Sequence, residues 1–185
     1  VRLRAAAGPK DIREGWVSVC DSGLLEAGDL SIGRISAMSG AAARAYVVEA
    51  TRAALRGDIA AVVTLPMNKE ATRLSDPSFT GHTELIGSIC GAPDVTIMLA
   101  SEQLIVTHVS THCSLRAAIE RVKKDRVQRI IELTCEAVAR LRPAPRVAVA
   151  GLTPHAGESG MFGREEIEEI QPAVAWARER GLHVE

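Results

Sequence analysis

The chain has 185 residues, of which 46% are hydrophobic and 24% charged, and its formal net charge is −1. This composition is typical of a globular protein and excludes a chain that is mainly disordered. The balanced charge and the few aromatic residues (3%) provide neither the basic surface nor the stacking platform of a nucleic-acid-binding protein. No apolar run reaches the roughly 20 residues of a membrane span. We therefore expect no nucleic-acid partner and no membrane partner.

The ends of the chain and its cysteines give a second set of expectations. Val1 is not a start methionine, and residues 1–13 lack the apolar stretch and cleavage site of a secretory signal. We interpret the chain as an internal segment of a longer protein. The four cysteines form no C-x-x-C pair, which predicts reduced thiols in a cytoplasmic protein rather than a zinc ribbon or a redox dithiol.

The predicted elements alternate between strands and helices after an irregular N-terminal stretch. Alanine and long side chains favour a helix at 41–55, capped by Ser36 or Ser39. The apolar run 60–65 predicts a buried parallel strand. The full set is a strand at 16–20, a helix at 41–55, a strand at 60–65, helices at 68–74 and 83–90, strands at 95–100 and 104–111, helices at 114–122 and 124–141, a strand at 146–152 and a helix at 165–180.

This order predicts an α/β fold with a mixed, mostly parallel sheet flanked by helices. The adjacent strands at 95–100 and 104–111 are expected to form an antiparallel hairpin, and the last helix is expected to lead into a strand. Apolar positions at helical spacing predict that the helix at 124–141 packs on the core. Ligands of open α/β sheets lie beyond the carboxyl ends of the strands, so functional residues are expected directly after each strand.

Two segments combine polar or cationic side chains with the start of a helix. Asn68 and Lys69 offer an amide, an ammonium and free backbone N–H groups, which suit an anionic ligand. His82 and Thr83 bring an imidazole and a hydroxyl to a second helix start. In both segments the alternative is ordinary helix capping.

Two histidines at the ends of predicted strands are candidate metal ligands. His112 follows the strand at 104–111, and His155 lies in the glycine-rich loop after the strand at 146–152. Neutral imidazole suits Zn, Co, Ni or Fe and less readily Mg, and a complete site normally has at least three protein ligands. The alternatives are a structural strand-end histidine and a connecting loop with an incidental histidine. His108 is interpreted as structural.

Four segments also carry a family resemblance through their sequence, order and spacing. They are Thr64–Ala71 (TLPMNKEA), Phe79–Glu84 (FTGHTE), Thr111–Arg116 (THCSLR) and Gly151–Glu166 (GLTPHAGESGMFGREE). Together they resemble the 4-hydroxythreonine-4-phosphate dehydrogenase family, the pyridoxine-biosynthesis dehydrogenases and their catabolic relatives. The resemblance corresponds to the middle of the family chain. Residues 1–185 are therefore expected to be a partial dehydrogenase domain that lacks the family's N-terminal segment and C-terminal third.

The resemblance implies a fold like that of isocitrate and isopropylmalate dehydrogenases, and a homodimer with active sites at the subunit interface. It implies oxidation of a hydroxy acid that depends on NAD or NADP and on a divalent metal (Zn, Co or Mg), often followed by β-decarboxylation. Carried over motif by motif, His82 and Thr83 are implied to bind substrate, and His112 and His155 to be two of three metal ligands. The third histidine belongs to a His-Asp-Gln-Gly motif that the chain does not contain. Catalytic and cofactor-binding residues are not assigned.

The remaining site assignments and the substrate rest on weaker signals. Asn68 and Lys69 are assigned to the substrate by physical analogy. Cys113 and Ser114 stand where the family usually has Leu-Pro. This departure favours phosphorylated threonate or erythronate, or an aromatic cis-dihydrodiol, over the biosynthetic 4-hydroxythreonine-4-phosphate. A non-catalytic metal- or ligand-binding module stays open, as does a metal hydrolase that uses Glu158 with the two histidines.

Overall fold

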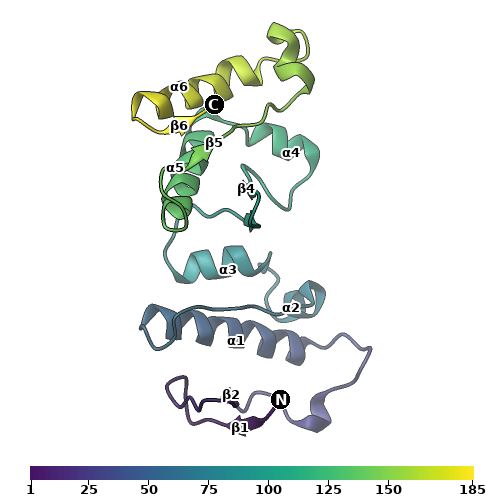
Figure 1. The fold of residues 1–185 in the computed structure, drawn as a ribbon. Helices are drawn as coiled ribbons and strands as arrows, with labels where there is room; N and C mark the ends of the chain where they lie inside the picture. Colours follow the sequence, from purple (N-terminus) through teal and green to yellow (C-terminus); the bar gives the residue numbers. More distant parts are fainter. The chain divides into compact units, whose positions relative to one another are not determined.

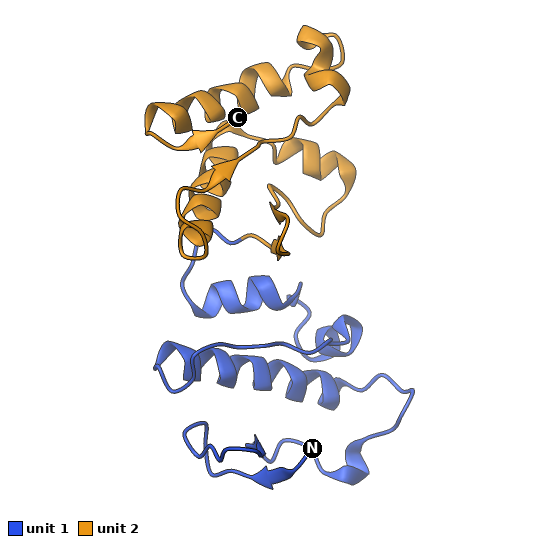
Figure 2. Ribbon diagram, viewed as in Figure 1, with its two compact units in different colours: residues 1–95 blue, residues 96–185 orange.

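The computed structural model describes residues 1–185, which form two compact units, 1–95 and 96–185 (Figure 2). Most of their helices and strands are labelled in Figure 1. Unit 1 contains β1 (Leu3–Ala5), β2 (Val17–Val19), the 3-10 turn η1 (Ala27–Asp29), α1 (Ala37–Leu55), α2 (Lys69–Ser75) and α3 (His82–Ile89). Unit 2 contains β3 (Met98–Ala100), β4 (Ile105–Thr107), α4 (Leu115–Glu120), α5 (Lys124–Ala139), β5 (Arg146–Val147), the turn η2 (Pro154–Gly160), the π-turn η3 (Glu166–Ile170), α6 (Gln171–Glu179) and β6 (His183–Val184).

Helix α1 is the long helix that the alanine-rich segment predicts, and Ser36 is its N-cap. The Ser36 side chain accepts a hydrogen bond from the Ser39 N–H at 3.4 Å. One turn into the helix, Gly40 is buried against the backbone of α2, and a Cβ at this position would overlap the Ala71 carbonyl. The contact requires glycine for steric reasons. It fixes the start of α2, and with it a candidate binding segment, against α1.

Two ion pairs fasten other parts of unit 1 to α1. Arg44 on α1 donates from Nε to the Asp76 carboxylate at 2.8 Å, just after α2 ends. Asp58, beyond the C-terminus of α1, lies 3.0 Å from the Lys10 ammonium, which belongs to the segment between β1 and β2.

Strands β1 and β2 pair in parallel. The predicted strand at 16–20 is therefore present in shortened form.

The prediction of a buried strand at 60–65 is wrong. Residues 61–68 have no regular secondary structure, and Val63 and Leu65 are 90% and 80% exposed. A strand is stable only when a neighbouring backbone accepts and donates its hydrogen bonds, and no strand of the chain pairs with this run. Its apolar composition therefore indicated burial that the chain by itself does not provide.

In unit 2, the predicted antiparallel hairpin is confirmed, but its strands are shorter than predicted. Strands β3 and β4 pair antiparallel, with Ser101 and Leu104 bonded across the turn at 2.9 Å. Because β4 ends at Thr107, His108 and His112 lie in the following loop and not on a strand. The end of that loop is fixed by Ser114, the N-cap of α4.

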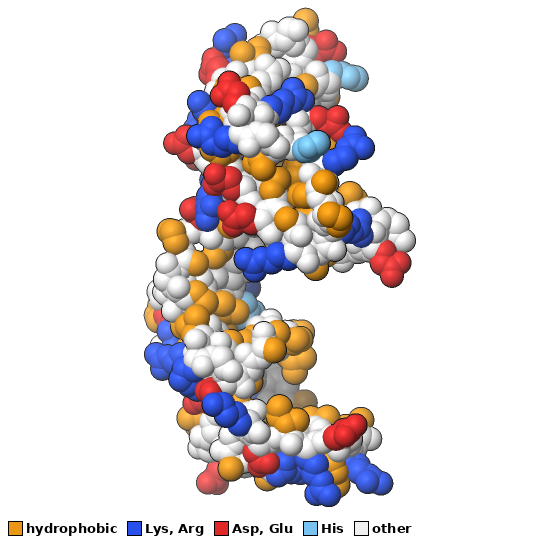
Figure 3. Space-filling model, turned by 60° about the vertical axis from the view of Figure 1, so that its left-hand side comes forward, with side chains coloured by type: hydrophobic (Ala, Val, Ile, Leu, Met, Phe, Trp, Pro, Cys, Tyr) orange, Lys and Arg blue, Asp and Glu red, His pale blue; other side chains and the backbone are white.

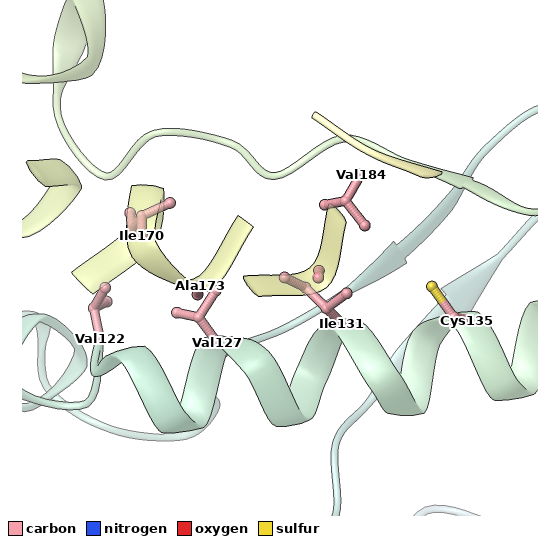
Figure 4. Packing of buried hydrophobic residues seen from close by; sticks show 8 residues of the cluster. Val122, Val127, Ile131, Cys135, Ile170, Ala173 and Val184 are labelled. Carbon is pink, nitrogen blue, oxygen red and sulfur yellow. The ribbon is translucent and has the colours of Figure 1, made fainter. Parts of the chain in front are cut away.

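The core of unit 2 lies between α5 and the segment from η3 to β6 (Figure 4). Val127 and Ile131 of α5 are only 2% and 3% exposed, which confirms the predicted apolar face of this helix. Burial of each such side chain contributes about 1.5–3 kcal/mol to stability. The complete cluster is Val122, Val127, Ile131, Cys135, Ile170, Ala173, Ala177 and Val184.

The last predicted helix is confirmed, with an irregularity before Pro172. Residues Glu166–Ile170 form a π-turn that continues directly into α6. Proline has no N–H to donate to the preceding turn, so it is tolerated only near a helix start, and here α6 begins one residue before it. After α6 the chain enters β6, which pairs in parallel with β5. The predicted final strand is therefore present.

The α/β class is confirmed, but the chain does not form the single mixed sheet that was predicted. It contains three separate two-stranded sheets, β1–β2, β3–β4 and β5–β6, of which two are parallel. A continuous sheet requires each inner strand to pair on both edges, and the segments expected to join the pairs do not form strands.

The surface of both units retains many apolar side chains, coloured orange on the face in Figure 3. None of the helices combines the length and the apolarity needed to cross a membrane. The four cysteines form no disulfide.

Candidate functional site

The first group of candidate residues lies in unit 1, where α2 begins. Asn68 is the N-cap of α2, and its side-chain oxygen accepts a hydrogen bond from the Ala71 N–H at 2.9 Å. The Asn68 side chain therefore acts as a helix cap, which was the alternative to a role in ligand binding. Lys69 is the first residue of the helix and is exposed, so its ammonium is available to a ligand.

The start of α2 lies beside the start of α3. A Cβ built on Gly81, the N-cap of α3, would lie 3.7 Å from Lys69 Nζ and 2.9 Å from Glu84 Oε2. The fold thus brings Lys69 next to the segment that carries His82 and Thr83. Gly81 has an extended backbone, so its φ angle does not require glycine. Glycine is favoured here because other side chains leave little room for a Cβ.

His82 has the clearest unsatisfied polar atom of this group. Its Nε2 is buried and has no hydrogen-bond partner. Leaving a buried polar atom unpaired costs about 1–3 kcal/mol, which a ligand atom could offset. The first N–H groups of α3 and the Lys69 ammonium both lie near Gly81, the residue before His82, and both favour an anion. The Glu84 carboxylate partly balances this positive charge.

In unit 2, His112 lies in the loop between β4 and α4. It has a left-handed backbone, with φ 51°, and its side chain is exposed. Non-glycine residues rarely adopt this conformation, and such strain concentrates at functional sites. Arg121 holds the preceding residue by donating from Nη1 to the Thr111 carbonyl at 3.5 Å. No hydrogen bond occupies the His112 ring itself.

His108 differs from His112 because its ring and backbone both have partners. Its Nδ1 lies 3.2 Å from the Ile97 carbonyl, and its own carbonyl accepts from Thr96 Oγ1 at 2.6 Å. These bonds tie the loop after β4 to the segment before β3.

His155 lies in a left-handed turn that the sequence does not predict. All five residues from His155 to Ser159 have positive φ, and only Gly157 among them lacks a side chain. The His155 side chain is exposed and makes no hydrogen bond. The position of the His155 ring is therefore set by the backbone of the turn and by the side chains that hold that backbone in place.

That support includes Glu166, a residue that sequence reasoning missed. Its side chain is buried, and Oε1 accepts hydrogen bonds from the N–H groups of Leu152 and Thr153 at 3.0 and 2.7 Å and from Thr153 Oγ1 at 2.8 Å. These bonds, the Thr153 N–H first, lower the pKa of the Glu166 carboxyl. The signal in the sequence was a carboxylate at a helix start directly after a glycine-rich loop.

The chain contains no cluster of three His, Cys, Asp or Glu side chains that could hold a metal ion. His112 and His155 therefore do not complete a site with a third side chain of this chain. Their chemistry still fits a divalent ion, because both imidazoles are exposed and free of hydrogen bonds. A separate hollow of about 250 Å³ is lined by Arg146, Val147, Arg178, His183, Val184 and Glu185, none of which is a candidate residue.

Comparison with known proteins places these features in a family. Residues 4–185 match the family described as pyridoxal phosphate biosynthetic protein PdxA. The chain is 41% identical to the D-threonate 4-phosphate dehydrogenase of Cupriavidus necator, in an alignment that covers 100% of this chain and 56% of the relative.

Solved structures agree with this match. The crystal structure of 4-hydroxythreonine-4-phosphate dehydrogenase from Klebsiella pneumoniae is 37% identical, with a TM-score of 0.90, and the match covers 100% of this chain and 57% of that one. A terephthalate 1,2-cis-dihydrodiol dehydrogenase from Burkholderia xenovorans is 29% identical, with a TM-score of 0.63 and the same coverage. The chain spans a little more than half the length of these relatives. The resemblance inferred from the four motifs is confirmed: the chain belongs to the PdxA family.

Proposed function

We propose that this protein is a dehydrogenase that oxidises the secondary alcohol of a phosphorylated hydroxy acid, with D-threonate 4-phosphate as the first substrate to test. The proposal is supported by two features at the N-terminus of α3, the buried, unpartnered Nε2 of His82 and the Lys69 ammonium next to Gly81. This arrangement provides donors and positive charge for an anionic group. It occurs in a family whose named members include dehydrogenases of phosphorylated substrates.

In this proposal, four residues of unit 1 form the substrate site. Lys69 holds the anionic group by charge, and the first N–H groups of α3 hydrogen-bond to it. The His82 ring and the Thr83 hydroxyl fix its orientation. Asn68 acts mainly through its cap of α2, which holds Lys69 in place.

Two residues of unit 2 are proposed to hold a divalent metal, Zn, Co or Mg, together with a third ligand outside this chain. These are His112 and His155, whose free imidazoles suit such an ion. The bound ion would lower the pKa of the substrate hydroxyl while NAD or NADP accepts the hydride. β-Decarboxylation would follow where the product is a β-keto acid.

We further propose the assembly implied by the family. The complete protein would have an isocitrate/isopropylmalate-dehydrogenase-like fold, residues 1–185 being a partial domain, and would act as a cytoplasmic homodimer with active sites between subunits. The exposed apolar residues of unit 1, such as Val63 and Leu65, support the view that further protein covers them. The four cysteines without disulfides are consistent with a reducing compartment.

The direct test is a substrate panel with the full-length protein, followed by absorbance at about 340 nm, where reduced nicotinamide absorbs. The panel contains D-threonate 4-phosphate, erythronate 4-phosphate, 4-hydroxythreonine-4-phosphate and an aromatic cis-dihydrodiol, each with NAD or NADP and divalent metal. Turnover of a phosphorylated acid supports the proposal. Turnover of the dihydrodiol alone favours a cis-dihydrodiol dehydrogenase, the function of the relative with the weaker structural match. No signal with any substrate, with metal confirmed bound, contradicts a dehydrogenase and leaves the non-catalytic binding module.

A further inference from the structure

Glu166 lies at the start of the π-turn η3 and is only 2% exposed. Its Oε1 accepts all three of its hydrogen bonds from Leu152 and Thr153, at 2.7 to 3.0 Å. Only Pro154 separates those two residues from the left-handed turn that carries His155. The carboxylate therefore anchors the chain at the entrance of the turn.

The second carboxylate oxygen faces the middle of the same turn. Glu166 Oε2 is buried without a hydrogen-bond partner and lies 3.0 Å from where a Cβ on Gly157 would stand. Gly157 is buried and has φ +80°, so any side chain there would meet both the carboxylate and an unfavourable backbone conformation. A single side chain thus touches the turn on both sides of His155, at Thr153 and at Gly157.

This support is needed because the turn is strained. Four of its five left-handed residues are not glycine, and each would relax to a right-handed or extended backbone if the turn were released. A change of φ at His155 would move its imidazole away from its present direction. An ionised carboxylate is a strong acceptor for backbone N–H groups, and its hydrogen bonds, the Thr153 N–H first, lower the pKa of Glu166.

We propose that Glu166 is a positioning residue that holds the His155 imidazole in the direction required for metal binding. The inference rests on the proposed function, in which His155 is a metal ligand. Glu166 is not itself offered as a ligand, since its carboxylate is buried and bonded to the backbone. Outer supports of this kind usually change metal affinity by about 10–100-fold.

The test compares variants of the full-length protein with the wild type. Glu166→Ala removes the acceptor, Glu166→Gln keeps a neutral one, and Gly157→Ala pushes a methyl group against Oε2. Glu168→Gln is the matched control, because Glu168 is exposed on the π-turn η3 and accepts its hydrogen bond from Arg164, not from the backbone that precedes His155. The measurements are Co²⁺ affinity by titration and hydrogen exchange of the Leu152 and Thr153 amides without metal.

We expect Glu166→Ala and Gly157→Ala to lower Co²⁺ affinity by about tenfold or more and to speed exchange at Thr153. Glu166→Gln is expected to recover most of the affinity, and Glu168→Gln to match the wild type. If Glu166→Ala does not fold, Gly157→Ala decides the question.

His155→Ala and His112→Ala distinguish a failure of the proposed function from a failure of the proposed role of Glu166. Wild-type Co²⁺ affinity in both histidine variants overturns the proposed function, and the role of Glu166 in metal binding fails with it. Weaker binding in the histidine variants, but unchanged affinity and exchange in Glu166→Ala and Gly157→Ala, overturns only the inference.

Discussion

The two candidate regions are held in place in different ways. In unit 1, the starts of α2 and α3 are regular helix ends, set by an Asn68 cap and by the tight contact at Gly40. In unit 2, both candidate histidines lie on left-handed backbone in loops, and one of the loops depends on the buried Glu166. The comparison indicates that the proposed anion site is built on regular structure, whereas the proposed metal ligands lie on strained loops whose stability comes from supporting side chains.

The largest expected effect is on metal binding by unit 2. His155→Ala or His112→Ala is expected to lower Co²⁺ affinity by at least about 100-fold, since removing a ligand exceeds the effect of removing its support. Turnover should fall with it, while circular dichroism stays unchanged because both side chains are exposed. His108→Gln is the control, and a loss as large as that of His112→Ala would reverse the assignment of the two residues.

In unit 1, the contact between α1 and α2 offers the next largest effect. Gly40→Ala places a methyl group where the Ala71 carbonyl lies and is expected to lower the free energy of unfolding by about 1–3 kcal/mol. Gly28→Ala is the matched control, because nothing lies within 4 Å of its Cβ position. Equal urea midpoints for the two variants would contradict the close packing described for Gly40.

A smaller effect is expected for substrate binding. Lys69→Ala removes the ammonium beside Gly81 and is expected to raise KM for a phosphorylated substrate by about tenfold, since a charge-assisted bond contributes about 1.5–3 kcal/mol and this one is partly screened. kcat should change less. Lys124→Ala, at another exposed helix start, is the control. An unchanged KM for Lys69→Ala would contradict the proposal that Lys69 binds the anionic group of the substrate.

The smallest effect is the dependence of stability on pH. Hydrogen bonds from Lys123 and from the Lys124 N–H lower the pKa of Glu169, and the pKa values of Asp11, Asp58, Asp76 and Glu166 are lowered as well. A lowered folded-state pKa adds stability above the unfolded values of 3.8 and 4.5, and this stability is lost as the pH falls below them. Urea midpoints should therefore decline between about pH 5 and pH 3, less steeply in Glu169→Gln. A flat profile in the wild type would contradict these pairings.

Much of the fold could be predicted from local sequence signals. The helices were predicted within a few residues because alanine content, Asn68 and Ser114 caps, and the apolar face of α5 act locally. The run at 60–65 could not be predicted, because strand formation depends on a partner elsewhere and apolar composition alone does not supply one.

The candidate site divides in the same way. The starts of α2 and α3 were found because polar residues beside helix starts are a local pattern. The turn at 155–159 was expected only as a glycine-rich loop, since its non-glycine residues have no preference for left-handed backbone. Glu166 escaped notice because its importance comes from burial and from bonds to residues 13 and 14 positions away.

We propose that His112 and His155 bind the same cation, and an anomalous difference map from crystals of the full-length protein with Zn²⁺ would show this directly. We expect one peak at about 2.0–2.1 Å from a ring nitrogen of each histidine, with a third ligand from beyond this chain. Two rings directed to unrelated regions, with the peak elsewhere, would contradict it.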